Sequence, residues 1–313
     1  MGLFSALERV LRTSPAPDRR LGEAIQRVVD AVDPLLKTLA GYQRRLAPAV
    51  TKAIMHCEQV AAAIPGPIDT RAQAFAHDPV LHSLFGAAQD IGDMLGRSRE
   101  LRDFLADPGN CESEEFFALL GMRRREKAVS GMALKGGVLQ HDVPQRLLYF
   151  ADHTLGEIGG GDEDARRRIA LAAFDSLARG FAACVADLRQ QHLDARTALQ
   201  LERARNGRVE RRLELEQRQR EAIASLAPER LLEAYADWLG SPQLRVFLKS
   251  SEFCVDRMGV ILPDGDAGGT ALCLPELVGR DRRQWTVVLA RIRREDALEA
   301  VRRQEQANRY LII

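Results

Sequence analysis

The sequence is poor in aromatic residues and contains no long hydrophobic run. Aromatic residues fill only 5% of its 313 positions, so a core must be built from leucine, valine, isoleucine and alanine. Such a core suits closely packed helices better than a large β-sandwich. No stretch approaches the roughly 20 consecutive apolar residues that span a bilayer, and no basic segment with a cleavage site opens the chain. We therefore expect no membrane span and a cytoplasmic location.

Cysteine is scarce and scattered. The chain has five cysteines, an odd number, and none of them forms a C-x-x-C pair. This spacing argues against a disulfide framework and against a zinc knuckle, and it favours reduced thiols. No metal ligand set or cofactor motif is predicted.

Lysine is also scarce, since only five of the 45 basic residues are lysines and the others are arginines. Together with the high alanine and leucine content, this bias is typical of a GC-rich bacterial genome. It also weakens any argument from a single arginine cluster. The formal net charge of +1 excludes a strong overall field that would attract nucleic acid or an anionic membrane.

Length and hydrophobic periodicity predict a mainly α (α+β) fold. A chain of this length accommodates two or three domains. We predict four consecutive parts: a helical bundle over 1–110, a short helix plus β-hairpin over 111–161, a long helical or coiled-coil arm over 162–240, and an antiparallel β segment with a C-terminal helix over 241–313.

The N-terminal half is predicted to be helical up to residue 110. From Leu21 to Ile64 apolar residues recur at helical spacing, and the prolines at 34 and 48 indicate either three helices or one long kinked helix. Asp78 followed by Pro79 is typical of a helix N-terminus. Ser113 to Glu126 also resembles a helix, because acidic residues lie in its first turn and arginines in its last.

Two stretches have β character. They cover about residues 127–158 and about 244–293, where β-branched residues alternate with turn signals. The first contains a predicted hairpin with a turn at Lys135-Gly136-Gly137. The two stretches flank the long helices, so one hypothesis is that they pair into one antiparallel sheet with the helices as an insertion, and the sequence alone does not decide it.

The central helical region carries a weak heptad register between residues 185 and 223. Its apolar seam positions are Val185, Leu188, Ala195, Leu199, Val209, Leu213 and Ile223. Glutamates at 202 and 216 interrupt the seam. The remaining positions are rich in Arg, Glu and Gln, so a solitary helix here would gain little from packing and would need a partner.

Asn206-Gly207 lies in the middle of this region. It could form the tight turn of a helical hairpin, or it could lie within one continuous helix at a cost of about 1 kcal/mol for the glycine. The seam register runs through Asn206 unbroken, and this favours the continuous helix.

The densest basic cluster is Arg123, Arg124, Arg125 and Lys127. It could contact phosphate or nucleic acid, although solvated charge at a helix end explains it as well. It is similar to the basic opening of cyclic-dinucleotide-binding PilZ domains. Their companion motif D/N-x-S-x-x-G does not follow, so we do not assign the chain to that family.

Catalytic motifs are weak. His141-Asp142 and Asp152-His153 fall in one predicted β stretch and could converge as an acid–base or metal cluster, but surface polar residues on half-exposed strands are the more ordinary interpretation. Gly159-Gly160-Gly161 is followed by acidic residues and does not fit a phosphate loop.

These patterns favour a non-enzymatic interaction or scaffold protein that acts through a coiled-coil arm. We expect its partner to be a second copy or another coiled-coil protein, and Asn206 on the seam would favour a specific register. The alternative is a regulatory protein that binds a nucleotide or nucleic acid through the arginine clusters. A third hypothesis is an enzyme with a site around Asp142, Asp152 and His153.

Overall fold

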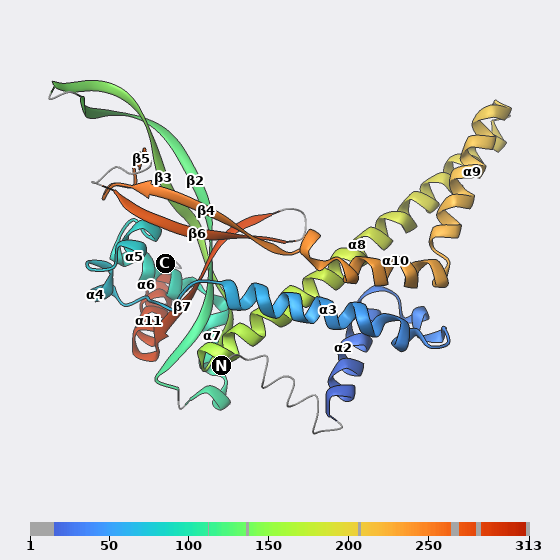
Figure 1. Cartoon of the computed structure of the whole chain (residues 1–313), viewed down its shortest axis with the longest axis horizontal. Coiled ribbons are helices and arrows are strands. Elements are labelled where there is room, and N and C mark those ends of the chain that lie inside the picture. Colours follow the sequence, from blue (N-terminus) through green and yellow to red (C-terminus); the bar gives the residue numbers. More distant parts are fainter. Residues whose placement is uncertain are drawn as a thin grey trace. The chain divides into compact units, whose positions relative to one another are not determined.

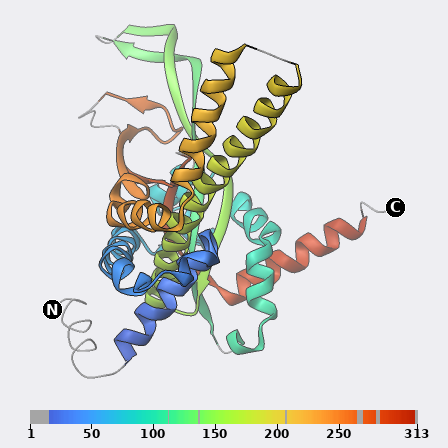
Figure 2. The ribbon, with the colours of Figure 1, turned by 90° about the vertical axis from the view of Figure 1, so that its right-hand side faces the viewer.

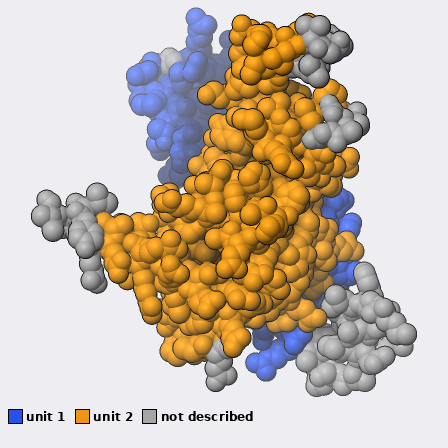
Figure 3. Space-filling view, turned by 90° about the vertical axis from the view of Figure 1, so that its left-hand side faces the viewer, with its two compact units in different colours: residues 1–57, 173–246 blue, residues 58–172, 247–313 orange. Residues whose placement is uncertain are grey.

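The computed structural model describes residues 16–111, 113–135, 138–205, 208–263, 269–279 and 283–310. It has an α+β fold, as predicted (Figure 1). The chain forms two compact units, each built from two separate segments (Figure 3). Unit 1 comprises Met1–Cys57 and Ala173–Val246, and unit 2 comprises Glu58–Ala172 and Phe247–Ile313. These units differ from the four consecutive parts that the sequence suggested.

Unit 1 is helical. Its elements are α2 (Ala16–Val32), η1 (Pro34–Thr38), the first part of α3 (Tyr42–Ala63), most of α8 (Asp162–Ala204), α9 (Val209–Ser225), α10 (Pro228–Gly240) and η3 (Pro242–Leu244). A break occurs at Asp33, whose carboxylate accepts a hydrogen bond from the Leu35 amide at 2.9 Å. Pro48, by contrast, lies inside α3, so only one of the two expected proline breaks is present.

Aromatic side chains of α8 and α10 pack together in unit 1. The rings of Phe181 and Tyr235 stack at 4.6 Å between centroids, and the Trp238 indole N–H donates to the Leu177 carbonyl at 3.0 Å. Each polar ring atom at this junction has a partner, since the Tyr235 hydroxyl donates to the Val28 carbonyl.

Unit 2 contains a seven-stranded sheet in the order β3-β2-β7-β6-β4-β5, with β1 paired to β7. The strands are β1 (Ile68–Asp69), β2 (Glu115–Lys135), β3 (Val138–Gly159), β4 (Phe247–Val255), β5 (Ile261–Leu262), β6 (Thr270–Val278) and β7 (Gln284–Arg293). All neighbours are antiparallel except β1 and β7. Because β2 pairs with β7, the two β stretches share one sheet, which answers the question that the sequence left open.

The short helix predicted over Ser113–Glu126 is wrong, because Glu115 onward forms strand β2. Phe116, Ala118, Leu120 and Met122 are fully buried on one face. Phe117 and Leu119 lie between them and are partly buried on the other face. A strand that packs on both faces has no apolar–polar alternation, so the charges at its two ends suggested a helix instead.

The predicted turn residues Gly136 and Gly137 lie outside the described residues, but the two strands on either side of them pair in the expected hairpin. That hairpin is longer than predicted, with 21 residues in β2 and 22 in β3.

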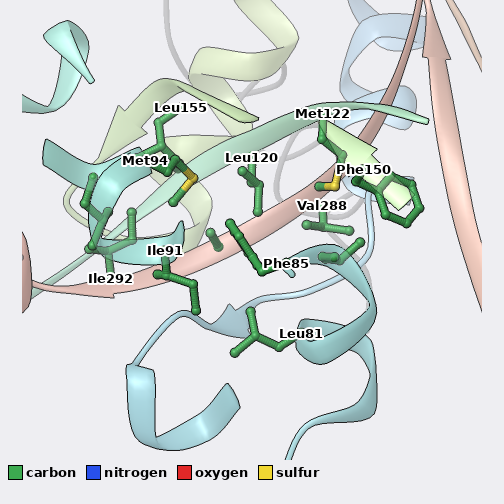
Figure 4. Packing of buried hydrophobic residues seen from close by; sticks show 14 of the residues in the cluster. Leu81, Phe85, Ile91, Met94, Leu120, Met122, Phe150, Leu155, Val288 and Ile292 are labelled. Carbon is green, nitrogen blue, oxygen red and sulfur yellow. The ribbon is translucent and has the colours of Figure 1, made fainter. Parts of the chain in front are cut away.

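Helices cover the face of the sheet that carries Phe116 and Leu120. They are α4 (Ala72–Phe75), α5 (Pro79–Leu84), α6 (Ala88–Arg97), α7 (Arg99–Ala106) and α11 (Arg294–Tyr310), and η2 (Pro108–Asn110) follows α7. Figure 4 shows how their apolar side chains meet those of the strands. The predicted N-terminus of α5 is confirmed, since Asp78 accepts hydrogen bonds from the amides of Val80 and Leu81.

The sheet curls until its two ends meet. Val260, next to β5, forms an isolated antiparallel bridge with Leu147 on β3, and the Leu148 amide donates to the Gly259 carbonyl at 2.8 Å. Gly259 has a φ of +81°, and a Cβ there would lie 2.8 Å from the Leu148 carbonyl oxygen. A glycine is therefore required where the edges touch.

Strand β3 contains three bulges, each with one residue more than the facing part of β2. The extra residues coincide with Asp142, Asp152 and Glu157, which have φ angles of 57°, 56° and 51°. Such left-handed backbone is rare outside glycine, and aspartate tolerates it better than most residues. The bulges increase the twist of the ribbon formed by β2 and β3.

By length and composition, α8 could cross a membrane, and it is the one helix of the described ranges that could. An 18-residue window of it has a mean hydropathy of 1.5, and 39% of that window is buried. Buried helices of soluble cores have the same composition, so this is weak evidence of a span. The expected cytoplasmic location stays a prediction.

Candidate functional site

Helices α8 and α9 form an antiparallel hairpin (Figure 2). Arg203 near the end of α8 pairs with Glu216 of α9 at 2.7 Å, and Glu202 pairs with Arg211 at 3.4 Å. The favoured interpretation of one continuous helix is therefore wrong. Asn206 and Gly207 themselves lie outside the described residues. The seam register could not reveal the reversal, because it depends on sequence spacing alone.

The hairpin separates the predicted seam into two sets. Val185, Ala195 and Leu199 on α8 are buried, and Leu188 is partly buried. The buried residue of α9 is Leu215, which is not a seam residue. A groove of about 640 Å³ between the helices is lined by Leu188, Ala195 and Leu215 together with polar residues.

The α9 part of the seam faces away from α8. Val209, Leu213 and Ile223 are 61%, 56% and 52% exposed. Between Leu213 and Ile223 the heptad positions are Arg220 and Glu216, and Glu216 is partly buried because it pairs with Arg203 of α8. We call these five residues the α9 stripe. It is apolar at both ends and charged in the middle.

The basic cluster on β2 is divided between two faces of the strand, because side chains alternate. Arg124 pairs with the buried Glu276 at 3.1 Å and lies over the Phe253 ring. Arg123 pairs with Asp152 at 3.6 Å and lies over the Trp285 ring. Two of the four predicted anion-binding residues, Arg123 and Arg124, thus already form ion pairs within unit 2.

Arg125 and Lys127 lie on the same face of β2 as Arg123, opposite to Arg124, and both are exposed. In the described part of the chain no carboxylate forms an ion pair with either of them. The predicted anion or nucleic-acid contact is therefore reduced to two unpaired cations. It stays a prediction.

A second groove, of about 760 Å³, lies in unit 2. It is lined by residues of α5, α6 and β3 and by the loop before β5, including Asp90, Asp93, Asp152, His153 and Asp256. The sequence-based enzyme hypothesis named two of these residues, Asp152 and His153. The third, Asp142, lies further out on the ribbon, where it accepts a hydrogen bond from Ser130.

The groups in this groove have structural partners. His153 Nε2 lies 2.8 Å from the Leu84 carbonyl, and its ring stacks on Phe85 at 4.5 Å. Asp90 accepts a hydrogen bond from a main-chain amide at the start of α6. Asp256 accepts two such hydrogen bonds in the loop before β5. Among the described residues no group of three His, Cys, Asp or Glu could hold a metal. This geometry offers no nucleophile with an adjacent base.

The clearest pKa shifts fall outside both grooves. Burial raises the pKa of Glu58 and of Tyr235, and burial with the neighbouring Glu295 raises that of Asp296. Burial alone would raise the pKa of Asp69, but hydrogen bonds from Arg71 and Arg291 hold it below its usual value. None of these four residues lines the grooves, so they do not mark a catalytic pair there.

Comparison with protein-family models, with curated proteins and with solved structures found no match to this chain.

Proposed function

We propose that this protein is a non-enzymatic interaction protein that associates with a second copy of itself through the α9 stripe. The exposure of Val209, Leu213 and Ile223 on one face of α9 carries this proposal. Within the hairpin α9 buries only Leu215 fully. A helix of 17 residues with so little buried apolar area is marginal without a further partner.

The stripe is complementary to itself when two copies run antiparallel. If Leu213 faces Ile223 of the second copy, Arg220 of that copy joins the pair that Glu216 forms with Arg203 of its own chain, and the two-fold axis repeats both contacts. Apolar side chains then meet apolar ones and opposite charges meet at the centre. This alternation of a and d positions is the packing of antiparallel coiled coils.

Charge does not oppose this association. Helix α9 contains four glutamates and four arginines, so two of these helices can approach without net repulsion. Two hairpins joined in this way would form a four-helix arrangement. The coiled-coil arm that the sequence predicts would then lie between two chains.

The double variant Leu213→Ala/Ile223→Ala tests the proposal. At about 1 kcal/mol for each partly buried side chain, the four truncations in a dimer cost about 4 kcal/mol, which is a roughly thousandfold rise in the dissociation constant. Sedimentation equilibrium measures it. Folding of the isolated chain should change little, since both side chains are exposed there.

The matched control is Leu193→Ala/Leu201→Ala, which removes two equally exposed leucines of α8 that lie outside the stripe. It should leave the dissociation constant unchanged. Arg220→Glu should weaken association, because it places carboxylates opposite each other. A native chain that stays monomeric at high concentration, or a control that weakens association equally, would overturn the proposal.

A further inference from the structure

The ribbon formed by β2 and β3 has an open edge. Strand β7 pairs with β2 only from Glu115 to Met122, and beyond Met122 no described strand pairs with the outer side of β2. Ala128, Ser130 and Met132 are all exposed there. Two-stranded ribbons are marginally stable in water, and an open strand edge is a template for a further strand.

The direction of the main-chain groups follows from one hydrogen bond. The Leu148 amide on β3 donates to Gly259, away from β2. In an antiparallel pair, residues opposite such a position also point their main-chain groups outward, and the pattern repeats every second residue. Leu148 faces Glu126, Arg146 faces Ala128 and Pro144 faces Ser130. The amides of Glu126, Ala128 and Ser130 therefore point to the open edge of β2.

The two edges of the ribbon differ in one residue. Pro144 occupies an outward-pointing position on β3, and proline has no amide to donate, so it blocks strand addition on that side. Strand β2 contains no proline between Glu115 and Lys135. Only the β2 edge can offer an uninterrupted row of donors and acceptors.

Charge indicates what this edge accepts. Arg125 and Lys127 lie beside the open edge without a carboxylate partner in the described ranges, whereas Arg123 and Arg124 are paired. Further out, residues 128–145 contain only Lys135 and Asp142 as charged groups. A ribbon whose outer half carries no net charge is poorly suited to follow a phosphate backbone.

We propose that the outer edge of β2, from Arg124 to Ser130, binds an extended acidic segment of another protein as an added strand. Main-chain hydrogen bonds to Glu126, Ala128 and Ser130 hold the segment, and its carboxylates lie beside Arg125 and Lys127. This is recognition by β-strand addition, with selectivity from alternate side chains. It is independent of the α9 stripe.

The test uses a fluorescein-labelled peptide of alternating Glu and Val and its Lys–Val counterpart, with anisotropy measured at low salt. The full-length chain should prefer the acidic peptide at least about tenfold. Ala128→Pro removes one outward donor without touching the β2–β3 hydrogen bonds, and it should weaken binding about tenfold. Arg125→Glu/Lys127→Glu should reverse the preference between the two peptides.

Pro144→Ala is the control, since it changes the other edge and should leave binding of the acidic peptide unchanged. Thermal unfolding of each variant verifies that the fold is intact. Equal binding of both peptides, no binding, or binding unaffected by Ala128→Pro would overturn the proposal. So would duplex DNA that competes with the peptide, or a change of oligomeric state caused by Ala128→Pro, which would show a second copy at this edge.

Discussion

Tyr235 is the largest fully buried side chain of unit 1, and its hydroxyl donates to the Val28 carbonyl at 3.0 Å. Burial raises its pKa far above the usual value near 10. The unfolded chain therefore ionises first when the pH rises, and folding stability falls only above about pH 10. Below about pH 10 the stabilisation that depends on a neutral Tyr235 hydroxyl is fully present.

Tyr235→Phe tests this at the scale of one residue. At neutral pH the variant should lose about 1 kcal/mol for the missing hydrogen bond. Above about pH 10 the native protein should lose stability faster than the variant, so the two urea-unfolding curves converge. Parallel pH dependence of both proteins would show that Tyr235 does not titrate between the folded and unfolded states.

Asp152 shows how a single side chain accommodates a strand defect. Its left-handed φ of 56° is strained for any residue except glycine. Asp152→Gly should therefore be nearly neutral, because relief of strain offsets the loss of the exposed Arg123 pair, which is worth at most about 1 kcal/mol. Asp152→Val should cost about 1–3 kcal/mol. Urea midpoints measure both, and equal destabilisation by the two substitutions would contradict this account of the bulge.

At the scale of elements, local signals were decisive where one face of an element is buried. Asp78 and Pro79 predicted the start of α5, which buries Leu81 and Leu84 on one face. The segment before Arg123 was misread, because both of its faces are apolar. No alternation of apolar and polar residues was present to indicate a strand, so the charges at the two ends of the segment led to the helix prediction.

The prediction of one continuous helix through Asn206 was wrong for another reason. A heptad register continues through a turn if the turn happens to preserve its phase, so spacing cannot distinguish one helix from two. Leu215, the residue of α9 that packs inward, is one of two leucines in a polar helix. Nothing in its local sequence separates it from Leu213, which faces outward. Only the position of α8 decides between them.

At the scale of the molecule, the question is whether the two units unfold independently of each other. Ala290 on the central strand β7 is fully buried in unit 2. Ala290→Asp places an unpaired carboxylate there and should cost more than about 3 kcal/mol. Hydrogen exchange read by mass spectrometry should lose protection in 58–172 and 247–313 but keep it in 173–246.

The control for this experiment is Gln284→Asp, at the exposed first residue of β7. It should retain protection in both units. Loss of protection throughout the chain in Ala290→Asp would mean that the units unfold as one cooperative body and not separately.

Strand β7 lies between β2 and β6, yet its residues 284–293 follow every other strand in sequence. On the ribosome, the β2–β3 ribbon therefore emerges more than a hundred residues before the strand that anchors its base. All segments of unit 1 are complete by residue 246. This unit can therefore fold before β7, which lies between β2 and β6, has been synthesised. During that interval the edge of β2 from Glu115 to Met122 has no strand beside it, and an unpaired edge of a nascent chain is prone to pair with other chains.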